Sequence, residues 1–445
     1  MRIRNYTDVL RYLNSFINYE RIVKFIYKKS LKLERTHSLF KNLRIELQAL
    51  KTIHIAGTKG KGSVAHFLGY ILSASGLRIG LYTSPHFKDF RERIRIIESS
   101  NSGICSRLIS ERQVITLVRE MKPALEKLRF HKRLGQLSFF EVYTALAFKY
   151  FLNEDLDFVI LECGLGGRLD ATNLCKSLIS VITKIDYDHT QQLGKTLEEI
   201  AWEKAGIIKD NSLVVSAQQR RAVEEVLRKK AKERDSKIYF YKKDFFSQNL
   251  RFKPNYTLFD YSSFLGAYKD LKIRNLGEHQ VENASLGIFC FQLLKRKFRL
   301  EERNLCRGLK EVFVRGRFQI IKKGQTVYIL DVAHNPLSIK VVNSQIKRYF
   351  PSKKVILIFG CSKNKPSKKM LKEISYDRII ITKANHPRAY NPWEIKKESS
   401  LKECIIIPSL KEAIRRAEEF SDFRSIIVIT GSFFLVAEAL TELEE

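Results

Sequence analysis

The chain has 445 residues, 44% of them hydrophobic, and a formal net charge of +32 at pH 7. This length predicts two or three domains, and the apolar fraction is ample for sizeable cores. The sequence has no run of about 18 apolar residues and no long apolar N-terminal segment, which argues against a membrane span and a signal peptide, so we expect a soluble cytoplasmic protein.

The seven cysteines and the basic residues are both scattered along the chain. No Cys-x-x-Cys pair occurs, which argues against a disulfide framework and against a cysteine zinc site. No recognisable nucleic-acid-binding module accompanies the positive charge. We therefore interpret it as a lysine-rich surface around a site for anionic small molecules, with some non-specific affinity for polyanions at low salt.

The first 300 residues or so alternate strands with helices. Apolar spacing predicts helices within residues 1–50, and a continuous apolar run predicts a buried strand at 157–161. The other predicted elements are a strand–loop–helix–strand unit (52–83), a loop or hairpin tip (97–103), helices (110–130, 138–152, 198–205, 283–294), strands (178–183, 212–217) and a small β-rich excursion (239–268).

A second α/β unit begins near Gly316. Its predicted elements are strands at 326–330, 354–359, 379–382, 404–407 and 426–430 and a helix at 410–420. We place the domain boundary between residues 311 and 316, which gives domains of residues 1–312 and 313–445. Strands that alternate with helices predict an α/β fold, in which mostly parallel sheets are flanked by helices.

A glycine-rich segment follows the first predicted strand: Gly57-Thr58-Lys59-Gly60-Lys61-Gly62-Ser63. The backbone N–H groups of such a loop and the N-terminus of the next helix bind phosphates. Lys61 is expected to reach the β- and γ-phosphates of ATP, and the Ser63 hydroxyl to bind Mg²⁺. The usual spacing, G-x-x-x-x-G-K-[ST], would need Ser or Thr at Gly62. Its place between a strand and a helix still favours a nucleotide site over a plain turn.

Polar loops follow three of the predicted strands, at residues 57–63, 162–170 and 184–189. Ligands of parallel sheets bind beyond the carboxyl ends of the strands. We therefore expect these loops to meet at a single active site at one edge of the sheet.

The glycine-rich loop, with Thr83-Ser-Pro-His86 after the next strand, resembles the folylpolyglutamate synthase/dihydrofolate synthase family of the Mur ligase superfamily. The resemblance covers nearly the whole chain in order, through Ser138-Phe-Phe-Glu141, Glu162-Cys-Gly-Leu-Gly-Gly-Arg-Leu-Asp-Ala-Thr-Asn173, Asp188-His-Thr-Gln-Gln-Leu-Gly194, Glu203-Lys-Ala-Gly-Ile-Ile-Lys209, Gly277-Glu-His-Gln-Val-Glu-Asn-Ala284, Gly316-Arg-Phe-Gln319, Asp331-Val-Ala-His-Asn-Pro336 and Thr430-Gly-Ser432. It implies an N-terminal P-loop-type ATPase domain and a smaller C-terminal Rossmann-like domain.

The resemblance also implies a reaction. ATP transfers its γ-phosphate to a carboxylate, and the amino group of glutamate attacks the acyl phosphate. The charge of the phosphates demands Mg²⁺ and cationic side chains. The family match places Ser84, Glu162 and His189 around one Mg²⁺, with Ser63 beside them. Without that match, Glu162 at a strand end and His189 in a loop are ordinary structural residues.

Lys204 lies in a predicted helix, where a solvated lysine is the plain interpretation. In the family the matching lysine is carbamylated, which turns a cation into an anion that Mg²⁺ can hold. Lysine must lose its proton to react with CO₂, and its pKa shifts readily on burial. The resemblance thus implies Lys61, Lys204, His189 and Arg317 as the catalytic residues.

Further residues complete the ATP site by resemblance. Arg317 resembles an arginine that reaches from the second domain to the phosphates, and Asn283 resembles a residue that contacts adenine. Asp331 and His334 resemble a pair that faces the nucleotide and the incoming glutamate. Polar side chains just before Pro336 are equally consistent with simple turn chemistry.

The acceptor pocket is expected to contain Ser138, Phe140, Asp170 and Ala171. An aromatic ring can stack on a flat pteridine or benzoyl ring, and a carboxylate can accept hydrogen bonds from ring N–H groups. Core packing is the alternative for Phe139 and Phe140, and we expect one of the two rings to do that.

Together these features predict an ATP- and Mg²⁺-dependent ligase that adds L-glutamate to dihydropteroate, to tetrahydrofolyl-glutamate or to both. The expected partners are small-molecule substrates, with no specific nucleic acid and no membrane, and we expect a monomer. The nearest alternative is another Mur-type ligase that acts on a UDP-sugar peptide. A nucleic-acid-binding ATPase, suggested by the +32 charge, is a third possibility.

Overall fold

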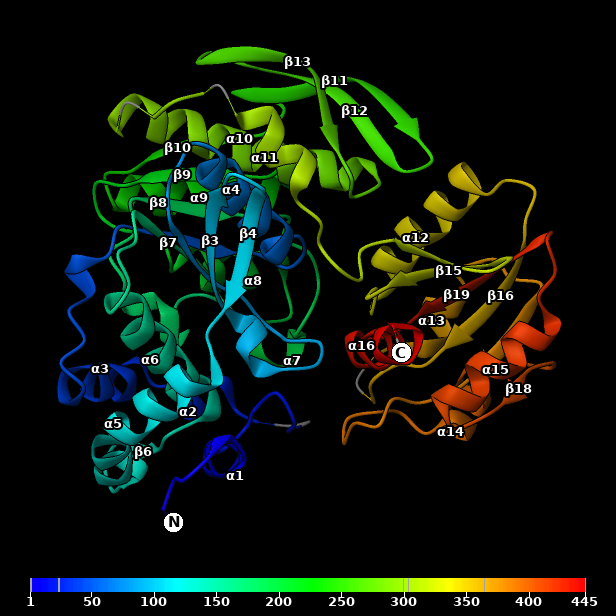
Figure 1. The fold of residues 1–445 in the computed structure, drawn as a ribbon, viewed down its shortest axis with the longest axis horizontal. Helices are drawn as coiled ribbons and strands as arrows, with labels where there is room; N and C mark the ends of the chain where they lie inside the picture. Colours follow the sequence, from blue (N-terminus) through cyan, green and yellow to red (C-terminus); the bar gives the residue numbers. More distant parts are fainter. Residues whose placement is uncertain (1, 23–24, 299, 303, 364, 445) are drawn as a thin grey trace.

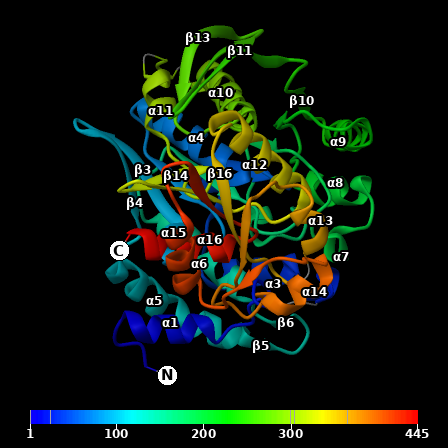
Figure 2. The ribbon, with the colours of Figure 1, turned by 90° about the vertical axis from the view of Figure 1, so that its right-hand side faces the viewer.

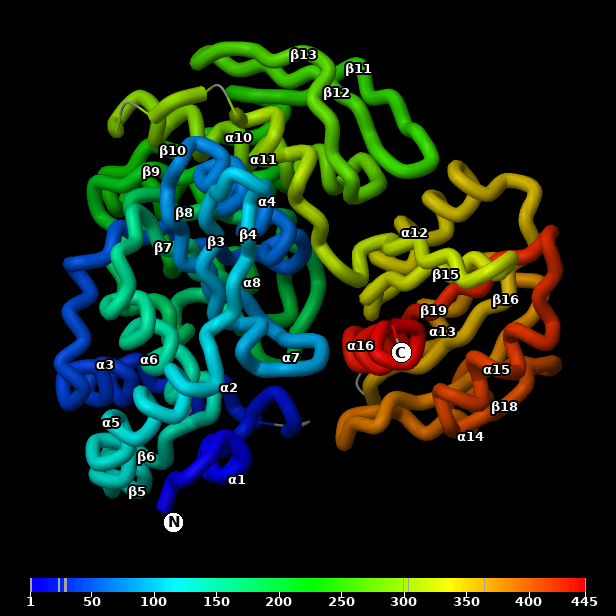
Figure 3. The backbone as a smooth tube through the Cα atoms, viewed as in Figure 1, coloured from blue at the N-terminus to red at the C-terminus, as the bar shows by residue number. Residues whose placement is uncertain are grey.

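The computed structural model describes residues 2–22, 25–298, 300–302, 304–363 and 365–444. A large α/β domain with an added antiparallel sheet is followed by a smaller α/β domain (Figure 1). Figure 3 shows the chain passing from α11 (Leu305–Glu311) through an irregular segment to β14 (Gln319–Lys323) of the smaller domain. The boundary predicted after residue 312 falls in this segment.

The helices of the larger domain are α1 (Tyr6–Asn14), α2 (Tyr27–Ser30), α3 (Leu33–Asn42), α4 (Lys61–Ala74), α5 (Glu111–Arg129), α6 (Phe139–Leu152), α7 (Thr190–Leu193), α8 (Leu197–Ala205), α9 (Arg221–Glu233), α10 (Glu278–Phe298) and α11. The short 3₁₀ turns are η1 (Leu47–Ala49), η2 (Phe90–Arg93) and η3 (Ala171–Leu174). Among the described residues of the chain, no helix is long and apolar enough to cross a membrane.

The main sheet has eight strands in the order β10-β9-β8-β1-β7-β2-β3-β4. They are β1 (Thr52–Ala56), β2 (Ile79–Tyr82), β3 (Ile94–Ser100), β4 (Gly103–Leu108), β7 (Phe158–Glu162), β8 (Ile179–Ile182), β9 (Leu213–Ser216) and β10 (Lys237–Phe240). The strands from β10 to β2 are parallel, and β3 and β4 form an antiparallel edge hairpin. Because β1, β7 and β8 are neighbours, the loops that follow them emerge together.

Successive residues of β7 explain how the sheet is covered on both faces. Ile160 packs in a core with α4, α10 and α11, whereas Val159 and Leu161 pack in a core with α1, α3, α5 and α6. Side chains alternate across a strand, so a strand that is apolar throughout must be buried on both faces. The continuous apolar run predicted this strand correctly.

Two predicted segments form β-structure, the first of them as the hairpin that the sequence analysis gave as one of two alternatives. Residues 97–103 belong to the β3–β4 hairpin, whose strands pair from Arg95 to Leu108. The predicted β-rich excursion is an antiparallel sheet of β11 (Phe245–Lys253), β12 (Tyr256–Ser263) and β13 (Gly266–Ile273), which packs on α10. Its first predicted residues, however, belong to β10 of the main sheet. The minor strands β5 (Phe130–His131) and β6 (Gly135–Gln136) form a separate pair.

The smaller domain has a six-stranded sheet in the order β14-β15-β19-β16-β17-β18, parallel except for β14. Its other strands are β15 (Thr326–Asp331), β16 (Lys354–Phe359), β17 (Arg378–Ile381), β18 (Ile405–Ile406) and β19 (Ser425–Thr430). Figure 2 shows α12 (Pro336–Tyr349) and α13 (Ser367–Leu371) on one side of β16, and α15 (Leu410–Phe420) and α16 (Phe433–Glu444) on the other. The two cores of this domain divide in the same way.

Among the described residues, sequence analysis did not identify seven of the helices: α7, α9, α11, α12, α13, α14 (Pro392–Ser399) and α16. In α9 the buried residues Val223, Leu227 and Ala231 recur every four positions, which is a helical signal. Its many lysines and arginines occupy the exposed face and were interpreted only as surface charge. The period of the apolar residues, rather than the composition, identifies this helix.

Replacing Phe67, which is completely buried where α4 packs against α10, should destabilise the larger domain. We expect Phe67→Ala to cost about 3–5 kcal/mol, because the ring leaves a cavity that the core fills only partly. Phe423→Ala, at a ring that is 66% exposed, should change stability by less than about 0.5 kcal/mol. Urea unfolding followed by circular dichroism measures both, and equal midpoints for the two variants would contradict this packing.

Candidate active site

The glycine-rich loop joins β1 to α4 and leaves the first turn of α4 open. Gly60 is the N-cap of α4, with φ +89°, and no side chain caps the helix. The N–H groups of a first helical turn have no partner within the helix, so they can bind an anion. The loop after β8 fixes the glycine-rich loop, because the Thr58 and Lys59 amides donate to the Lys184 carbonyl oxygen at 3.0 and 3.2 Å.

Two lysines converge on the same backbone atom of this loop. The ammonium groups of Lys61 and Lys204 donate to the Gly57 carbonyl oxygen at 3.2 and 2.9 Å. Lys204 comes from α8 and is only 4% exposed. Burial, followed by the charge of Lys61, lowers the pKa of Lys204 to about 7. A substantial fraction of this amine is therefore neutral, and able to react with CO₂, near pH 7.

Of the four residues predicted to hold Mg²⁺, two have side chains in a state that suits the ion: Glu162 and Ser63. Glu162, the last residue of β7, is 4% exposed, and its Oε2 accepts from the Ser84 amide at 3.1 Å. Burial raises the pKa of Glu162, and Lys61, the Ser84 amide and Arg317 oppose the rise. Ser63 Oγ is buried and has no hydrogen-bond partner among the described residues. A buried carboxylate and an unpartnered hydroxyl are hard oxygen donors that suit Mg²⁺.

His189 lies at the N-terminus of α7, in a left-handed backbone conformation with φ +50°, and its side chain is exposed. Its ring makes no hydrogen bond with any other described residue. The described residues also include no cluster of three His, Cys, Asp or Glu side chains placed to hold a metal ion. The assignment of His189 to Mg²⁺ remains a prediction.

The preceding residue, Asp188, connects the two domains, and sequence analysis gave it no role. Its Oδ1 accepts from Lys365 Nζ at 2.6 Å, and its Oδ2 accepts from His334 Nε2 at 3.2 Å. His334 Nδ1 also lies 2.9 Å from the Val332 carbonyl oxygen. No sequence motif could have indicated that Asp188 contacts His334 and Lys365, because these residues are far apart in the chain. His334, predicted to face the nucleotide or glutamate, thus lies at the domain junction.

Arg317 brings a positive charge from the smaller domain to the glycine-rich loop. Burial lowers the pKa of Arg317, and the nearby carboxylates of Asp331 and Glu162 oppose this. The Asp331 carboxylate accepts from the amides of Phe318 and Ala333, both at 2.8 Å. Asp331 therefore positions the turn that carries Arg317.

Asn335 and Asn283 occupy polar positions beside the two loops. Asn335 caps α12 by accepting from the Ser338 amide, which is the turn chemistry considered for this motif. Asn283 lies on α10, donates to Gln280 Oε1 at 3.1 Å and is buried. A Cβ atom on Gly60 would come within 2.4 Å of Asn283 Oδ1. The glycine thus allows α10 to approach the phosphate loop, while adenine contact by Asn283 stays a prediction.

The residues predicted to bind the acceptor lie at the N-termini of the helix α6 and of the short 3₁₀ turn η3. Ser138 caps α6 and donates to Glu141 Oε2 at 2.6 Å, and Asp170 accepts from Thr172 Oγ1 at the same distance. Both side chains, like Ala171, are buried, and burial raises the pKa of Asp170. Phe140 is half-buried against Gly164 and Tyr82. Its contact with an acceptor, like that of the other three residues, remains a prediction.

Phe139 is buried in the core, as expected for one ring of the pair.

A second cluster of charged residues lies at the domain junction, and sequence analysis did not identify it. Arg93 is buried and donates to both carboxylate oxygens of Glu20, at 2.9 and 2.7 Å. Arg388 of the smaller domain donates to the Glu20 carbonyl at 3.0 Å. The segment between α1 and α2 therefore contacts both domains.

Two family models match the chain in this order. Residues 132–291 match the Mur ligase middle domain, and residues 316–433 match the glutamate ligase domain of Mur ligases. The two-domain fold and the phosphate loop at the domain junction therefore define a Mur ligase.

Similar proteins show which family of Mur ligases the chain belongs to. Dihydrofolate synthase/folylpolyglutamate synthase of Bacillus subtilis is 31% identical over 411 residues, 91% of this chain and 93% of the relative. The crystal structure of folylpolyglutamate synthase from Thermotoga maritima is 34% identical with a TM-score of 0.81 and covers 99% of this chain and 96% of that chain. A folylpolyglutamate synthase complex with AMPPCP and folate is 27% identical with a TM-score of 0.82 and covers 99% and 100%. The chain belongs to the dihydrofolate synthase/folylpolyglutamate synthase family and is an ATP-dependent ligase.

Gly60→Ala should weaken nucleotide binding by about tenfold or more, equivalent to about 1.4 kcal/mol, because the new Cβ atom must displace buried Asn283. Gly76→Ala is a matched control: Gly76 has φ +84°, but nothing lies within 4 Å of the added atom. Backbone strain is therefore similar in the two variants. Calorimetric titration with a non-hydrolysable ATP analogue measures the difference, and unchanged affinity of Gly60→Ala would disprove the close approach.

Proposed function

We propose that this enzyme uses ATP and Mg²⁺ to add L-glutamate to dihydropteroate, to tetrahydrofolyl-glutamate or to both. The main support is the meeting of Lys61 and Glu162 of the larger domain with Arg317 of the smaller one. Cations from two domains beside a phosphate loop suit transfer of a γ-phosphate between ATP and a second substrate. A relative with AMPPCP and folate bound contains the same two classes of ligand.

In the first step, an oxygen of the acceptor carboxylate attacks the γ-phosphorus. The bond from that phosphorus to the bridging oxygen breaks, ADP leaves, and an acyl phosphate remains. The first N–H groups of α4 and the Lys61 ammonium hold the phosphates, and Arg317 balances the charge that develops on the transferred group. Mg²⁺ held by Ser63, Ser84, Glu162 and His189 would further neutralise phosphate oxygens.

In the second step, the uncharged amino group of glutamate attacks the acyl carbon. The new C–N bond forms the amide, inorganic phosphate leaves, and the proton of the amine passes to phosphate or solvent. Asp331 acts indirectly, because both of its carboxylate oxygens accept backbone N–H groups beside Arg317. Both halves of the site come from one chain, and we expect the enzyme to act as a monomer.

We further propose that Lys204 is carbamylated in the active enzyme. Its buried amine has a pKa of about 7, so the neutral form that reacts with CO₂ is well populated. Carbamylation replaces one of two adjacent positive charges by a negative charge, which relieves the repulsion between Lys204 and Lys61. The resulting carboxylate oxygens suit Mg²⁺ better than an ammonium group does.

Lys204→Ala should lower kcat by about a hundredfold or more, corresponding to about 2.7 kcal/mol. Lys195→Ala, at an exposed lysine just before α8, serves as the control. Because the neutral amine increases as pH rises through about 7, unaltered enzyme incubated at pH 8 with bicarbonate should gain activity and the mass of one CO₂, and lose both at acid pH. Native mass spectrometry and turnover measure these changes. Full activity of Lys204→Ala would remove Lys204 from the mechanism.

ADP release should require ATP, glutamate and a folate-type acceptor together, because the acyl phosphate forms on the acceptor. A coupled assay with dihydropteroate and tetrahydrofolyl-glutamate, each offered alone, identifies the acceptor. ADP release with neither acceptor, but with a UDP-sugar peptide, would favour the other Mur-type ligases. Stimulation of ATP turnover by DNA or RNA would favour a nucleic-acid-binding ATPase, with a steep salt dependence of binding.

A further inference from the structure

The imidazole of His54 lies where the strand before the phosphate loop meets the turn that carries Asp170. His54 is the middle residue of β1 and is completely buried. Ile53 and Ile55 pack with α4 on one face of the main sheet, so the side chain of His54 points to the opposite face. No step of the proposed reaction uses this ring.

Three side chains surround the ring with hydrogen-bonding atoms. His54 Nε2 lies 2.7 Å from Thr172 Oγ1 and 3.0 Å from Cys163 Sγ. His54 Nδ1 lies 3.7 Å from Cys175 Sγ. Thr172 Oγ1 in turn donates to Asp170 Oδ1 at 2.6 Å. We refer to His54, Thr172 and Asp170 as the His54 chain.

The hydrogen bonds of the His54 chain determine which ring nitrogen carries the proton. Asp170 also accepts from the Leu165 and Thr172 amides, at 2.9 and 3.1 Å, as an ionised carboxylate does. The single hydroxyl proton of Thr172 therefore goes to Asp170, and Oγ1 accepts from Nε2–H of His54. Burial, and then the charge of Lys209, lower the pKa of His54 well below its usual range, so the ring stays neutral.

The same Nε2–H group also faces Cys163, which joins the His54 chain to the end of β7. Cys163 directly follows Glu162, the carboxylate predicted to hold Mg²⁺, and its amide donates to the Ile55 carbonyl oxygen of β1 at 2.9 Å. One imidazole therefore contacts both the strand end that carries Glu162 and the turn that carries Asp170. It sets the position of one carboxylate relative to the other.

A histidine that only fills space in the core is the plain alternative for His54. The burial of Asp170 argues against it. Burial raises the pKa of the Asp170 carboxyl, and the Thr172 hydroxyl is the largest influence that opposes the rise. A buried carboxylate is costly unless hydrogen bonds satisfy it, so the His54 chain supports the charged form that can accept from ring N–H groups.

We propose that His54 and Thr172 are positioning residues for the acceptor, because their two hydrogen bonds in series hold the Asp170 carboxylate at a fixed place beside the phosphate loop. This inference rests on the proposed function, since the contact of Asp170 with the acceptor is itself a prediction. The acceptor carboxylate must meet the γ-phosphate while its ring contacts Asp170. A misplacement of about 1 Å costs about a hundredfold in rate, so the separation of these two points matters.

The test compares two substitutions of Thr172 in the full-length enzyme. Thr172→Val keeps the shape of the side chain and removes its hydroxyl, whereas Thr172→Ser keeps the hydroxyl. The matched control is Thr382→Val, at a completely buried threonine of the smaller domain whose hydroxyl donates to the Pro408 carbonyl at 3.3 Å. Each protein is assayed with dihydropteroate and with tetrahydrofolyl-glutamate, and its affinity for a non-hydrolysable ATP analogue is measured by calorimetry.

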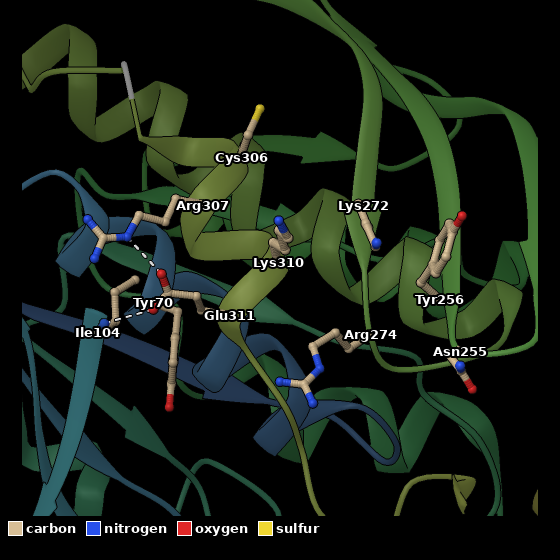
Figure 4. Close-up of a pocket in the computed structure, with 10 residues that line it drawn as sticks. All are labelled: Tyr70, Ile104, Asn255, Tyr256, Lys272, Arg274, Cys306, Arg307, Lys310 and Glu311. Atoms are coloured by element: carbon tan, nitrogen blue, oxygen red, sulfur yellow. Dashed lines mark hydrogen bonds and ion pairs between the residues drawn. The ribbon is translucent and has the colours of Figure 1, made fainter. Parts of the chain in front are cut away.

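A second control lies on the other face of the main sheet. Tyr70 of α4 lines a concave surface of about 1040 Å³, together with exposed Lys310 and Arg274 (Figure 4). Neither His54 nor Thr172 lines this surface. Tyr70→Phe removes one hydroxyl from the helix that begins at the phosphate loop and leaves the His54 chain intact.

Thr172→Val should raise the KM for the acceptor by about ten- to hundredfold, as expected for a lost hydrogen bond to a charged group. Thr172→Ser, which keeps the donor, should stay within about threefold of the unaltered enzyme. The affinity for the ATP analogue should be unchanged in both variants. The kcat should fall by less than the KM rises, because the reacting groups are intact. A general structural effect would not produce this split or the recovery in Thr172→Ser.

His54 is tested through its dependence on Thr172. His54→Leu should raise the same KM, and His54→Gln, whose amide N–H can replace Nε2–H, should raise it less. Adding His54→Leu to Thr172→Val should change the KM by no more than about twofold, because both substitutions break the same chain. Fully additive effects would contradict the series of two hydrogen bonds.

Nitrogen-15 NMR of histidine-labelled, unaltered enzyme tests the chain even if the His54→Leu protein fails to fold. Comparison with the spectra of His54→Gln and Thr172→Ser identifies the His54 ring. We expect a neutral ring with its proton on Nε2 from about pH 6 to about pH 8, where an ordinary histidine titrates. A proton on Nδ1, or a ring that titrates in this range, would overturn the proposal.

An unchanged acceptor KM in Thr172→Val would also overturn it, as would an equal rise in Thr382→Val and Tyr70→Phe. Absence of ligation with either acceptor in the unaltered enzyme would instead contradict the proposed function, and with it the contact of the acceptor with Asp170. The NMR spectrum would still decide whether the hydrogen-bond chain exists.

Discussion

The Gly57 carbonyl oxygen, which accepts from both Lys61 and Lys204, is the contact on which the rest of the site depends. Two ammonium groups held together, one of them buried, repel each other unless an anion or the loss of a proton compensates. The structure allows both kinds of compensation. The open N-terminus of α4 attracts phosphate, and burial makes Lys204 easy to deprotonate. This concentration of positive charge is what the proposed phosphate site requires.

The second domain supplies what the first cannot. Glu162 ends strand β7 and Lys61 begins helix α4, so both belong to the larger domain. Arg317 comes from a turn of the smaller domain, which the Asp331 carboxylate holds through two backbone N–H groups. The ion pair of Asp188 with Lys365 and the contact of Asp188 with His334 hold these two surfaces against each other. Because the second substrate must meet the γ-phosphate, a site divided between domains can admit that substrate and then exclude water around it.

The net charge of +32 acquires a partial explanation from the same geometry. Many basic residues lie on exposed helix faces, as in α9, where they make the surface hydrophilic. A smaller set lies close to α4, since Arg317 and Arg95 both lower the pKa of His66 and Arg95 is close to Tyr70. Substrates of the proposed reaction carry carboxylates and phosphates at many points. Basic residues around the site would therefore attract and orient them over a longer distance than the reacting atoms themselves.

The sequence by itself determined the class of fold, the glycine-rich loop and the family, because apolar period and glycine position are local properties. Apolar continuity predicted β7, and the spacing of Gly60 and Lys61 predicted a phosphate site. Tertiary structure alone decided the partners of Asp188, the shared contact of Lys61 and Lys204, and the grouping of Lys310 with Arg274. These contacts join residues distant in the chain, and their energies depend on burial and on the packing of two domains, which no local pattern of residues records.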